Sequence, residues 1–206
     1  MQVTDQNNGA DPAPSRVTAV ILAAGRSTRM APVNKLTADY QGTALVRHAA
    51  EAALASRVGE VIVVVGHEAE AVREVLSGLD VRIVANPDYA TGLASSVKAG
   101  VAAVGPHATA AVILLGDMPG VTAAVVDALI GAFEKTGRSK ICQPRYDGRP
   151  GNPVLWPSPL FPEFETLSGD IGAKPLLVRH KADVLGVDVG TDAIHMDIDA
   201  PTDLGA

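Results

Sequence analysis

The chain has 206 residues, a formal net charge of −6 at pH 7 and only 3% aromatic residues. This length suffices for one α/β domain with an aliphatic core and is too short for two ordinary domains with linkers. Because no stretch concentrates Lys or Arg, the sequence argues against nucleic-acid and membrane partners, and its single cysteine, Cys142, excludes an internal disulfide and favours a reducing, cytoplasmic location.

The first 16 residues are polar and include Pro12 and Pro14, which predicts a disordered lead in front of a single domain over residues 17–206. No apolar run approaches the ~20 residues of a membrane span. Residues 17–22 are continuously apolar or β-branched. Such a run is typical of a strand that is covered on both faces of a parallel sheet.

A loop of small residues, Ala-Ala-Gly at 23–25, should follow this strand, and the cations Arg26, Arg29 and Lys35 come after it. Small residues let main-chain N–H groups approach a bulky anion, and nearby cations neutralise its charge. The loop lacks both the dinucleotide fingerprint Gly-x-Gly-x-x-Gly and the Walker pattern. We therefore predict a polyphosphate site here, although strand–glycine–helix turns with a nearby Arg are common in other phosphate-binding sheets.

Strands and helices then alternate as far as residue 136. Further buried strands are expected at residues 61–65, 81–85 and 111–115, and helices at 44–56, 70–76, 94–104 and 122–136, the last with Thr122 as its N-cap. This alternation predicts a Rossmann-like, three-layer α/β/α fold with a mostly parallel, doubly wound sheet.

Ligands of such a sheet bind outside the carboxyl ends of its strands. Four loops follow strand ends and should converge on one crevice. They are residues 23–35, 66–69, 86–95 and 116–119.

The second half of the chain is richer in turns. We expect a strand at 141–145, a loop at 147–153, a strand at 154–156, short helices at 159–166 and 171–180, strands at 184–189 and 195–198, and a last helical turn within 199–203.

The main candidate for metal binding is Asp117, at the end of a buried strand in the segment Gly-Asp-Met-Pro. A carboxylate that faces bound phosphates is a natural Mg²⁺ ligand. Asp197 and Asp199 would share one face of an extended segment, so either could supply a second carboxylate, and we favour Asp199. The alternative roles are helix caps, for Asp117 before the helix after Pro119 and for Asp199 before Pro201.

Gly92, Ser95 and Ser96 precede a helix beside the same crevice. Taken alone, the serines are better explained as helix caps, but main-chain groups and a hydroxyl there could also read the edge of a base. Gly66, at the end of the second strand, is assigned to the same nucleotide site. The histidines lack metal-ligand spacing, and Cys142 lacks the partners of a nucleophile.

Several segments resemble the MobA-like nucleotidyltransferase family, and within it the branch of molybdenum cofactor cytidylyltransferases. The resemblance extends from residue 17 to residue 204. The matching segments are Leu-Ala-Ala-Gly-Arg-Ser-Thr-Arg-Met at 22–30, Gly-Leu-Ala-Ser-Ser-Val at 92–97, Gly-Asp-Met-Pro at 116–119, Gly-Asn-Pro-Val-Leu at 151–155, Leu-Ser-Gly-Asp-Ile-Gly-Ala-Lys at 167–174 and Asp-Ile-Asp-x-Pro-x-Asp at 197–203.

The resemblance implies a fold of the nucleotide-diphospho-sugar transferase type, with a nucleotide-binding half over about 17–120 and an acceptor half over about 121–206. It implies Mg²⁺-dependent transfer of CMP from CTP to the phosphate of a molybdopterin-type cofactor, with release of pyrophosphate and delivery of the product to a molybdenum hydroxylase. Guanylyl-transferring relatives have glycine at the position of Ala24. The methyl group of Ala24 should narrow the base pocket against a purine, which favours CTP.

The residue patterns, together with the resemblance, predict the site residues. The catalytic residues are Arg29, Lys35 and Asp117. The nucleotide-binding residues are Leu22, Ala23, Ala24, Gly25, Arg26, Gly66, Gly92, Ser95 and Ser96. The acceptor-binding residues are Asn152, Gly169 and Asp170, of which Asp170 could equally be an N-cap. The metal ligands are Asp117 and Asp199.

Three other functions remain open from the sequence. One is nucleotidyl transfer with GTP or with another acceptor, such as a sugar or isoprenoid phosphate. Another is an NAD(P)H-dependent oxidoreductase built on this fold. The third is a non-catalytic protein that delivers cofactor to a molybdenum hydroxylase.

Overall fold

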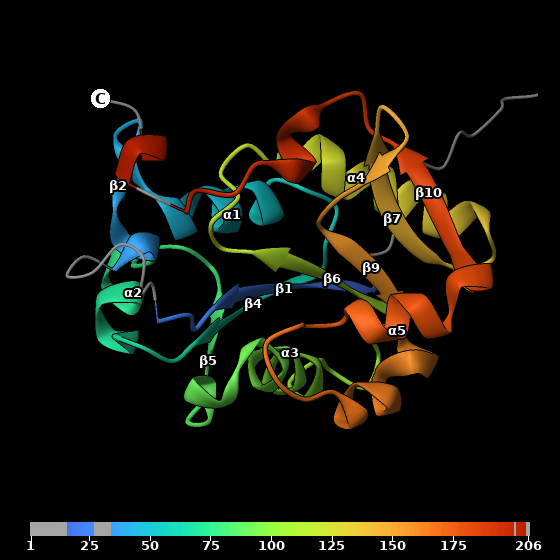
Figure 1. The fold of residues 1–206 in the computed structure, drawn as a ribbon, viewed down its shortest axis with the longest axis horizontal. Coiled ribbons are helices and arrows are strands. Elements are labelled where there is room, and N and C mark those ends of the chain that lie inside the picture. The colour runs from blue at the N-terminus through green and yellow to red at the C-terminus, as the bar shows by residue number, and fades with distance from the viewer. Residues whose placement is uncertain (1–15, 27–33, 200, 205–206) are drawn as a thin grey trace, which may run out of the picture.

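A computed structural model describes residues 16–26, 34–199 and 201–204. Its main feature is an eight-stranded, mostly parallel sheet with helices on both faces (Figure 1). The helices are α1 (Leu45–Leu54), α2 (Ala69–Val75) and α4 (Ala123–Lys135) on one face, and α3 (Leu93–Ala102) and α5 (Lys174–Arg179) on the other. This arrangement confirms the predicted three-layer α/β fold.

The sheet contains strands from both halves of the sequence. In order across the sheet these are β10 (Val184–Asp188), β7 (Ile141–Tyr146), β9 (Val154–Pro157), β6 (Ala110–Leu115), β1 (Val17–Ala23), β4 (Glu60–Val65) and β5 (Arg82–Ala85), with β8 (Arg149–Pro150) paired to β7. Strand β9 runs antiparallel to both of its neighbours, β6 and β7. A separate hairpin consists of β2 (Asp39–Tyr40) and β3 (Thr43–Ala44).

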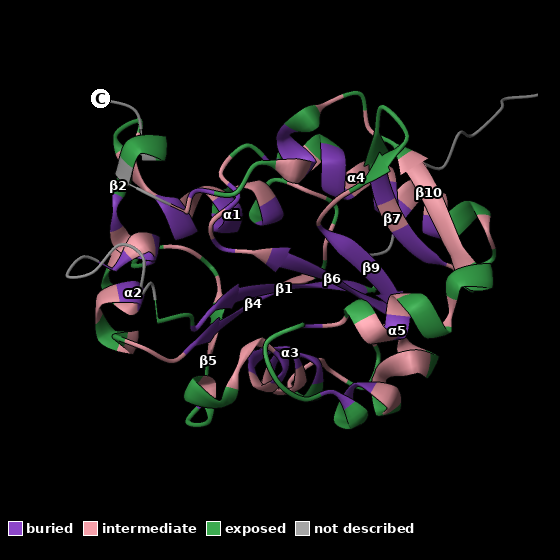
Figure 2. Ribbon diagram, viewed as in Figure 1, coloured by how far each residue is buried: buried purple, intermediate pink, exposed green. Residues whose placement is uncertain are grey.

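Strand β1 lies near the middle of the sheet, parallel to β4 and β6, and all of its residues are buried (Figure 2). Successive side chains of a strand point to opposite faces. Accordingly Ala19 and Ile21 pack in the core beneath α1 and α4, while Val20 and Leu22 pack in the core beneath α3. A strand buried on both faces explains the unbroken apolar run that predicted it.

Two of the expected helices differ from the prediction. Helix α5 begins only at Lys174, because Gly169 and Gly172 adopt positive φ angles of 71° and 56°, which a right-handed helix does not contain. Residues Ser158–Thr166 form a 3₁₀ helix, η4, with Pro162 inside it. Proline lacks a backbone N–H and so cannot donate the bond that an α-helix would need at that position.

The strand expected at residues 195–198 is wrong. A 3₁₀ helix, η6 (Asp192–His195), is followed by chain that pairs with no strand of the described structure. Ile194 and Ile198 are buried, and the N–H of Ile198 donates a hydrogen bond to the carbonyl of Asp117 at 3.0 Å. The apolar residues therefore attach this segment to the loop after β6, at the end of the sheet instead of along its edge.

The other boundaries agree with the sequence to within a few residues. Thr122 stands at the N-cap of α4 as predicted, but its side chain makes no capping hydrogen bond. The disordered lead predicted for residues 1–16 lies outside the described residues except for Arg16. None of the helices in the described part of the chain is long and apolar enough to cross a membrane.

Candidate functional site

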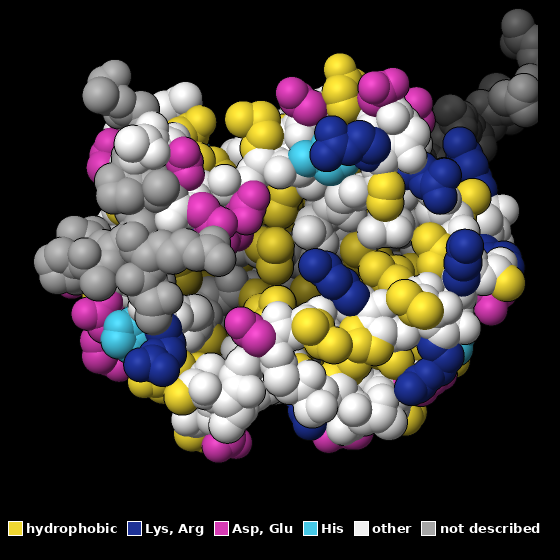
Figure 3. All heavy atoms as spheres, in the orientation of Figure 1, with side chains coloured by type: hydrophobic (Ala, Val, Ile, Leu, Met, Phe, Trp, Pro, Cys, Tyr) yellow, Lys and Arg dark blue, Asp and Glu magenta, His cyan; other side chains and the backbone are white. Residues whose placement is uncertain are grey.

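A cleft of about 920 Å³ opens at the carboxyl ends of β1 and β6. One wall is the segment 197–199, which follows Ile194 in the core beneath α1 and α4. The opposite wall lies on the α3 side of the sheet and consists of residues 89–93, Ser96, Gly169, Asp170 and Lys174. Figure 3 shows a hollow on this face with acidic and basic side chains around its rim.

Three of the four loops that the sequence predicted to converge do line the cleft, and the loop at 66–69 does not. Gly66 instead lies beneath Tyr89, because a Cβ atom at Gly66 would come within 2.5 Å of the Cβ of Tyr89 and 2.9 Å of the Cβ of Ala24. The absence of a side chain at Gly66 thus lets Tyr89, which lines the cleft, pack close to Ala24 in the loop after β1. Tyr89 was not among the site residues predicted from the sequence.

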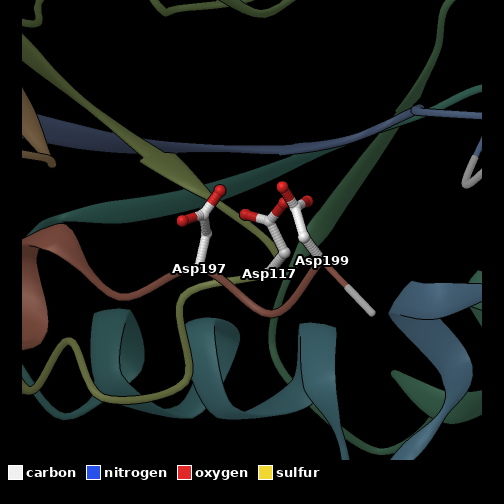
Figure 4. A group of neighbouring side chains, drawn as sticks. All are labelled: Asp117, Asp197 and Asp199. Atoms are coloured by element: carbon white, nitrogen blue, oxygen red, sulfur yellow. The ribbon is translucent and has the colours of Figure 1, made fainter. Parts of the chain in front are cut away.

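Three carboxylates form the acidic centre of the cleft. One carboxylate oxygen from each of Asp117, Asp197 and Asp199 lies within 4.8 Å of the others, and the side chains point the same way (Figure 4). Asp117 follows β6, where the N–H of Gly116 still bonds to the carbonyl of Leu22 at 3.1 Å. The bond from Ile198 to Asp117 fixes the C-terminal segment so that Asp197 and Asp199 flank it.

Lys35 bridges two of these carboxylates. Its Nζ atom donates to Oδ2 of Asp117 at 2.7 Å and to Oδ1 of Asp199 at 2.9 Å. Burial lowers the pKa of Lys35, but the hydrogen bonds and negative charges of Asp117 and Asp199 outweigh it and raise the pKa above its usual 10.5. Asn34 orients the backbone that carries Lys35, because its Oδ1 accepts a hydrogen bond from the N–H of Leu36 at 3.0 Å.

The acidic centre fits a divalent cation. The Oδ1 atom of Asp117 is buried and accepts no hydrogen bond from the described residues, so it has a free lone pair that faces low-dielectric surroundings. Clustered carboxylate oxygens are the donors that hard divalent cations such as Mg²⁺ prefer. Asp117 and Asp199 are therefore together as the sequence predicted, and Asp197, which the sequence left as an alternative, lies with them.

Asn86 organises the loop that precedes α3. Its amide Nδ2 donates to Ser95 Oγ at 2.9 Å and to Ser96 Oγ at 3.1 Å, and its Oδ1 accepts from the N–H of Asp88 at 3.0 Å. Ser96 lines the cleft, as expected of a nucleotide-binding residue. Ser95 does not: it lies toward a neighbouring cavity of about 570 Å³, with its hydroxyl within 2.9 Å of the carbonyl of Gly92.

A clasp of residues 92–94 and 169–170 joins the two halves of the chain. The N–H of Leu93 donates to the Asp170 carboxylate at 3.0 Å, and the N–H of Ala94 donates to the Gly169 carbonyl at 3.1 Å. Gly92 has a φ of +116°, and a Cβ atom there would lie 2.5 Å from the Gly169 carbonyl oxygen. Asp170 therefore caps the N-terminus of α3, not the helix that follows it in sequence, and it also lines the cleft.

The remaining predicted residues divide into three groups. Those that line the cleft are Leu22, Ala24, Gly25, Arg26, Gly92, Gly169 and Asp170. Ala23 and Asn152 do not line it: Ala23 is fully buried in β1, and the N–H of Asn152 is bonded to the carbonyl of Ile194. Arg29 lies outside the described residues.

Lys174 lines the cleft and was not selected from the sequence. Its only sequence signal was its place at the end of the segment 167–174, in which Gly169 and Asp170 were chosen instead.

A family model described as the MobA-like NTP transferase domain matches residues 19–184. The chain belongs to this family. The family assignment made from the sequence motifs is therefore confirmed, and the MobA-like chain is a nucleotidyltransferase whose family uses nucleoside triphosphates.

Two curated relatives cover almost the whole length of this MobA-like chain. A nicotine blue oxidoreductase from Paenarthrobacter nicotinovorans is 33% identical over 189 residues, which is 89% of this chain and 92% of the relative. A molybdenum cofactor cytidylyltransferase from Escherichia coli is 30% identical over 193 residues, which is 92% of this chain and 94% of the relative.

Solved structures of similar proteins agree with the fold. A homologue of Rv0371c from Mycobacterium sp. strain JC1 has a TM-score of 0.83 and 30% identity over 93% of this chain and 94% of its own. Rv0371c from Mycobacterium tuberculosis, in complex with manganese, has a TM-score of 0.73 and 29% identity over 91% of this chain and 95% of its own. A similar protein thus binds a divalent metal ion.

Proposed function

We propose that this protein transfers CMP from CTP to the phosphate of a molybdopterin-type cofactor and releases pyrophosphate. The observation that carries the proposal is the acidic centre at the carboxyl end of β6, where Lys35 lies between Asp117 and Asp199. The similarity to a molybdenum cofactor cytidylyltransferase over nearly the whole of both chains supports the choice of acceptor. A molybdenum hydroxylase would then receive the product.

Asp117, Asp197 and Asp199 are the residues that would hold the divalent cation, which we take to be Mg²⁺. When bound, such an ion supplies positive charge next to the phosphate oxygens. Oδ1 of Asp117 is the buried atom of this set that the described protein leaves without a hydrogen bond.

The phosphates of CTP would bind along the loop that follows β1, where Ala24, Gly25 and Arg26 line the cleft together with Lys35. An ammonium that already lies among carboxylates can turn to a phosphate oxygen, where it neutralises charge as pyrophosphate leaves. Arg29, which we assign to the same task, precedes Lys35 in the sequence.

The transfer needs no general base. An oxygen of the acceptor phosphate attacks the α-phosphorus of CTP and forms a new P–O bond, while the bond from the α-phosphorus to the bridging oxygen breaks and pyrophosphate departs with its electron pair. The second pKa of a phosphate monoester is ~6, so the attacking group is already largely dianionic near neutral pH. This is consistent with a cleft whose described lining contains neither His nor Cys.

The base would lie between Ala24, Tyr89 and Ser96. All three line the cleft, and Asn86 fixes the Ser96 hydroxyl by a hydrogen bond of 3.1 Å. An aromatic ring beside a small side chain offers a surface on which a base can stack. The methyl group of Ala24 narrows this space, which supports a pyrimidine over a purine.

The test is pyrophosphate release by the purified protein with Mg²⁺ and molybdopterin-type cofactor, given CTP or GTP separately. We expect release with CTP and at least tenfold less with GTP at equal concentrations, because a misfitting base costs on the order of 1–3 kcal/mol. Equal rates with GTP would contradict the base assignment. Absence of pyrophosphate with CTP and the acceptor would contradict the proposed function.

An oxidoreductase is the second candidate, because the relative named nicotine blue oxidoreductase is 33% identical over 89% of this chain. The same cleft would then bind NAD(P)H, although the first loop lacks the dinucleotide fingerprint. Oxidation of NADPH, followed at 340 nm with a quinonoid dye as electron acceptor, separates the two candidates. We expect no protein-dependent oxidation, and steady turnover would favour the oxidoreductase.

A further inference from the structure

Lys174 is the cation of the described cleft lining that the proposed reaction has not yet used. The other described charged residues that line the cleft are Arg26, Lys35, Asp117, Asp170, Asp197 and Asp199. Lys35 is bonded to two carboxylates, and Asp170 caps α3. Among the described residues, the Nζ atom of Lys174 has no hydrogen-bond or salt-bridge partner, so its ammonium is available to a ligand.

The backbone of Lys174 is held firmly against the α3 wall. The clasp ties Gly169 and Asp170 to the start of α3, and a Cβ atom at Gly172 would lie 3.0 Å from a methyl group of Leu93. Two residues beyond Lys174, Leu176 is 1% exposed in the core on that side. Lys174 thus belongs to the wall that faces the segment carrying Asp197 and Asp199.

The chemistry of nucleotidyl transfer requires positive charge on that wall. Two anions, the triphosphate and the acceptor phosphate, must come together, and their repulsion has to be offset by fixed cations. Arg26 and Lys35 belong to the nucleotide-binding half. Of the described residues after residue 120, Lys174 is the cation that lines the cleft.

We propose that Lys174 binds the phosphate group of the acceptor and holds it opposite the acidic centre. The ligand class is a phosphate monoester, and this inference rests on the proposed function for the identity of the group that reacts. Lys174 acts as a point charge, which suits a dianion that must reorient during attack. The clasp is then a positioning element, because it sets the distance between this cation and the nucleotide.

The variants Lys174→Met and Lys174→Arg test the proposal, with Lys98→Met as the matched control. Lys98 also lies on the α3 side of the sheet but lines the neighbouring cavity, not the cleft. In steady-state assays with CTP and molybdopterin-type acceptor, Lys174→Met should raise the KM for the acceptor roughly tenfold or more, the loss expected for one charge-assisted hydrogen bond. The KM for CTP should stay within twofold, and Lys174→Arg should restore most of the acceptor affinity.

An unchanged acceptor KM in Lys174→Met would overturn the inference, and so would a raised KM for CTP, which would move Lys174 to the triphosphate. An equal loss in Lys98→Met would show a general charge effect and would also contradict it. Because Lys174 is exposed, the variant should fold, and its melting temperature checks this.

A second readout separates this inference from the proposed function. Inorganic phosphate, titrated by calorimetry into the Mg²⁺-loaded protein with saturating non-hydrolysable CTP analogue, probes the subsite without turnover. We expect binding by wild type and Lys98→Met and at least a tenfold weaker constant for Lys174→Met. Equal constants, or no binding by wild type, would overturn the Lys174 assignment. If the wild type binds phosphate but does not react with the molybdopterin-type acceptor, the proposed function fails while the subsite stands.

Discussion

The side chain of Asp117 has two oxygens in different situations. Oδ2 accepts a hydrogen bond from the ammonium of Lys35 at 2.7 Å, while Oδ1 is buried and accepts no hydrogen bond from the described residues. A buried carboxylate oxygen without a partner carries a desolvation cost, which a bound cation would offset. This asymmetry separates Asp117 from an ordinary helix cap, the alternative that the sequence left open.

Replacement of Asp117 by Asn should abolish most of the activity and keep the fold. The amide keeps an oxygen to accept the Lys35 hydrogen bond, but it removes the negative charge that a divalent cation needs. We expect kcat/KM for CTP to fall on the order of 100-fold or more, measured by pyrophosphate release.

Asp147→Asn is the control for this experiment. Asp147 is exposed in the turn between β7 and β8 with a φ of +49°, a conformation that Asn also tolerates. This variant should have wild-type activity. Asp117→Asn with activity close to wild type would contradict the role given to the acidic centre.

At the residue scale, the site residues that directly follow an apolar strand could be predicted from the sequence. Those whose position depends on contacts with distant parts of the chain could not. Asp117 was predictable because an apolar strand ends just before it. Tyr89 was not, because its position depends on the missing side chain of Gly66 on another loop. Lys174 was passed over because the sequence cannot tell which side of a turn-rich segment faces a cleft.

At the scale of elements, the clasp connects the start of α3 to a turn 77 residues later in the chain. Both partners were among the predicted site residues, but as independent binders of different substrates. The structure explains their glycines differently: Gly92 and Gly169 allow two backbone segments to approach within hydrogen-bond distance.

Replacement of Gly92 by Ala should open the clasp. The new Cβ atom would lie 2.5 Å from the Gly169 carbonyl oxygen, and the φ of +116° is strained for any residue with a side chain. We expect the free energy of unfolding in urea to fall by about 1–3 kcal/mol. The KM for the acceptor should rise as well, because the wall that carries Lys174 moves.

Gly105→Ala is the matched control, because a Cβ atom there meets nothing within 4 Å and no positive φ is involved. Its unfolding free energy should stay within about 0.5 kcal/mol of wild type. Equal stability of the two variants would show that the clasp does not constrain the fold.

Element types were predictable wherever the apolar pattern was regular. The strands β1, β4 and β6 read as continuous apolar runs because both faces are covered. Residues 195–198 instead alternate polar and apolar side chains, yet Met196 is 54% exposed, and buried Ile198 anchors a loop and not a strand. Alternation in a sequence does not show whether a neighbouring strand is present to pair with the segment.

At the scale of the molecule, one sheet joins the two halves, since β9 of the second half pairs with β6 of the first. The cleft lies at the carboxyl ends of the central strands. The wall with Asp197 and Asp199 packs against one face of the sheet, and the wall with Lys174 packs against the other. The order of the strands could not be predicted, because the antiparallel insertion of β9 between β6 and β7 leaves no local signal in the sequence.

The reactivity of the Cys142 thiol can be used to measure how often this sheet opens. It is fully buried in β7, which lies between β9 and β10, and burial raises the pKa of its thiol from 9.0 to about 11. A raised pKa leaves the thiol protonated at pH 8, so the reactive thiolate is scarce as well as inaccessible. We expect labelling by 5,5′-dithiobis(2-nitrobenzoic acid) at pH 8 to proceed only as fast as the protein unfolds.

Labelling should therefore accelerate with urea in parallel with the loss of the circular dichroism signal. Complete reaction of one thiol within seconds in native buffer would contradict the burial of β7 within a stable sheet.

The proposed reaction requires the acidic centre to hold a divalent cation next to the phosphates of a nucleoside triphosphate. Anomalous diffraction from crystals grown with Mn²⁺ and a non-hydrolysable CTP analogue tests this requirement. We expect a manganese peak at coordination distance from Asp117 Oδ1 and from at least one of Asp197 and Asp199, with the triphosphate beside it. A triphosphate bound elsewhere, or manganese absent from these carboxylates while Lys35 still bridges Asp117 and Asp199, would contradict the role proposed for the acidic centre.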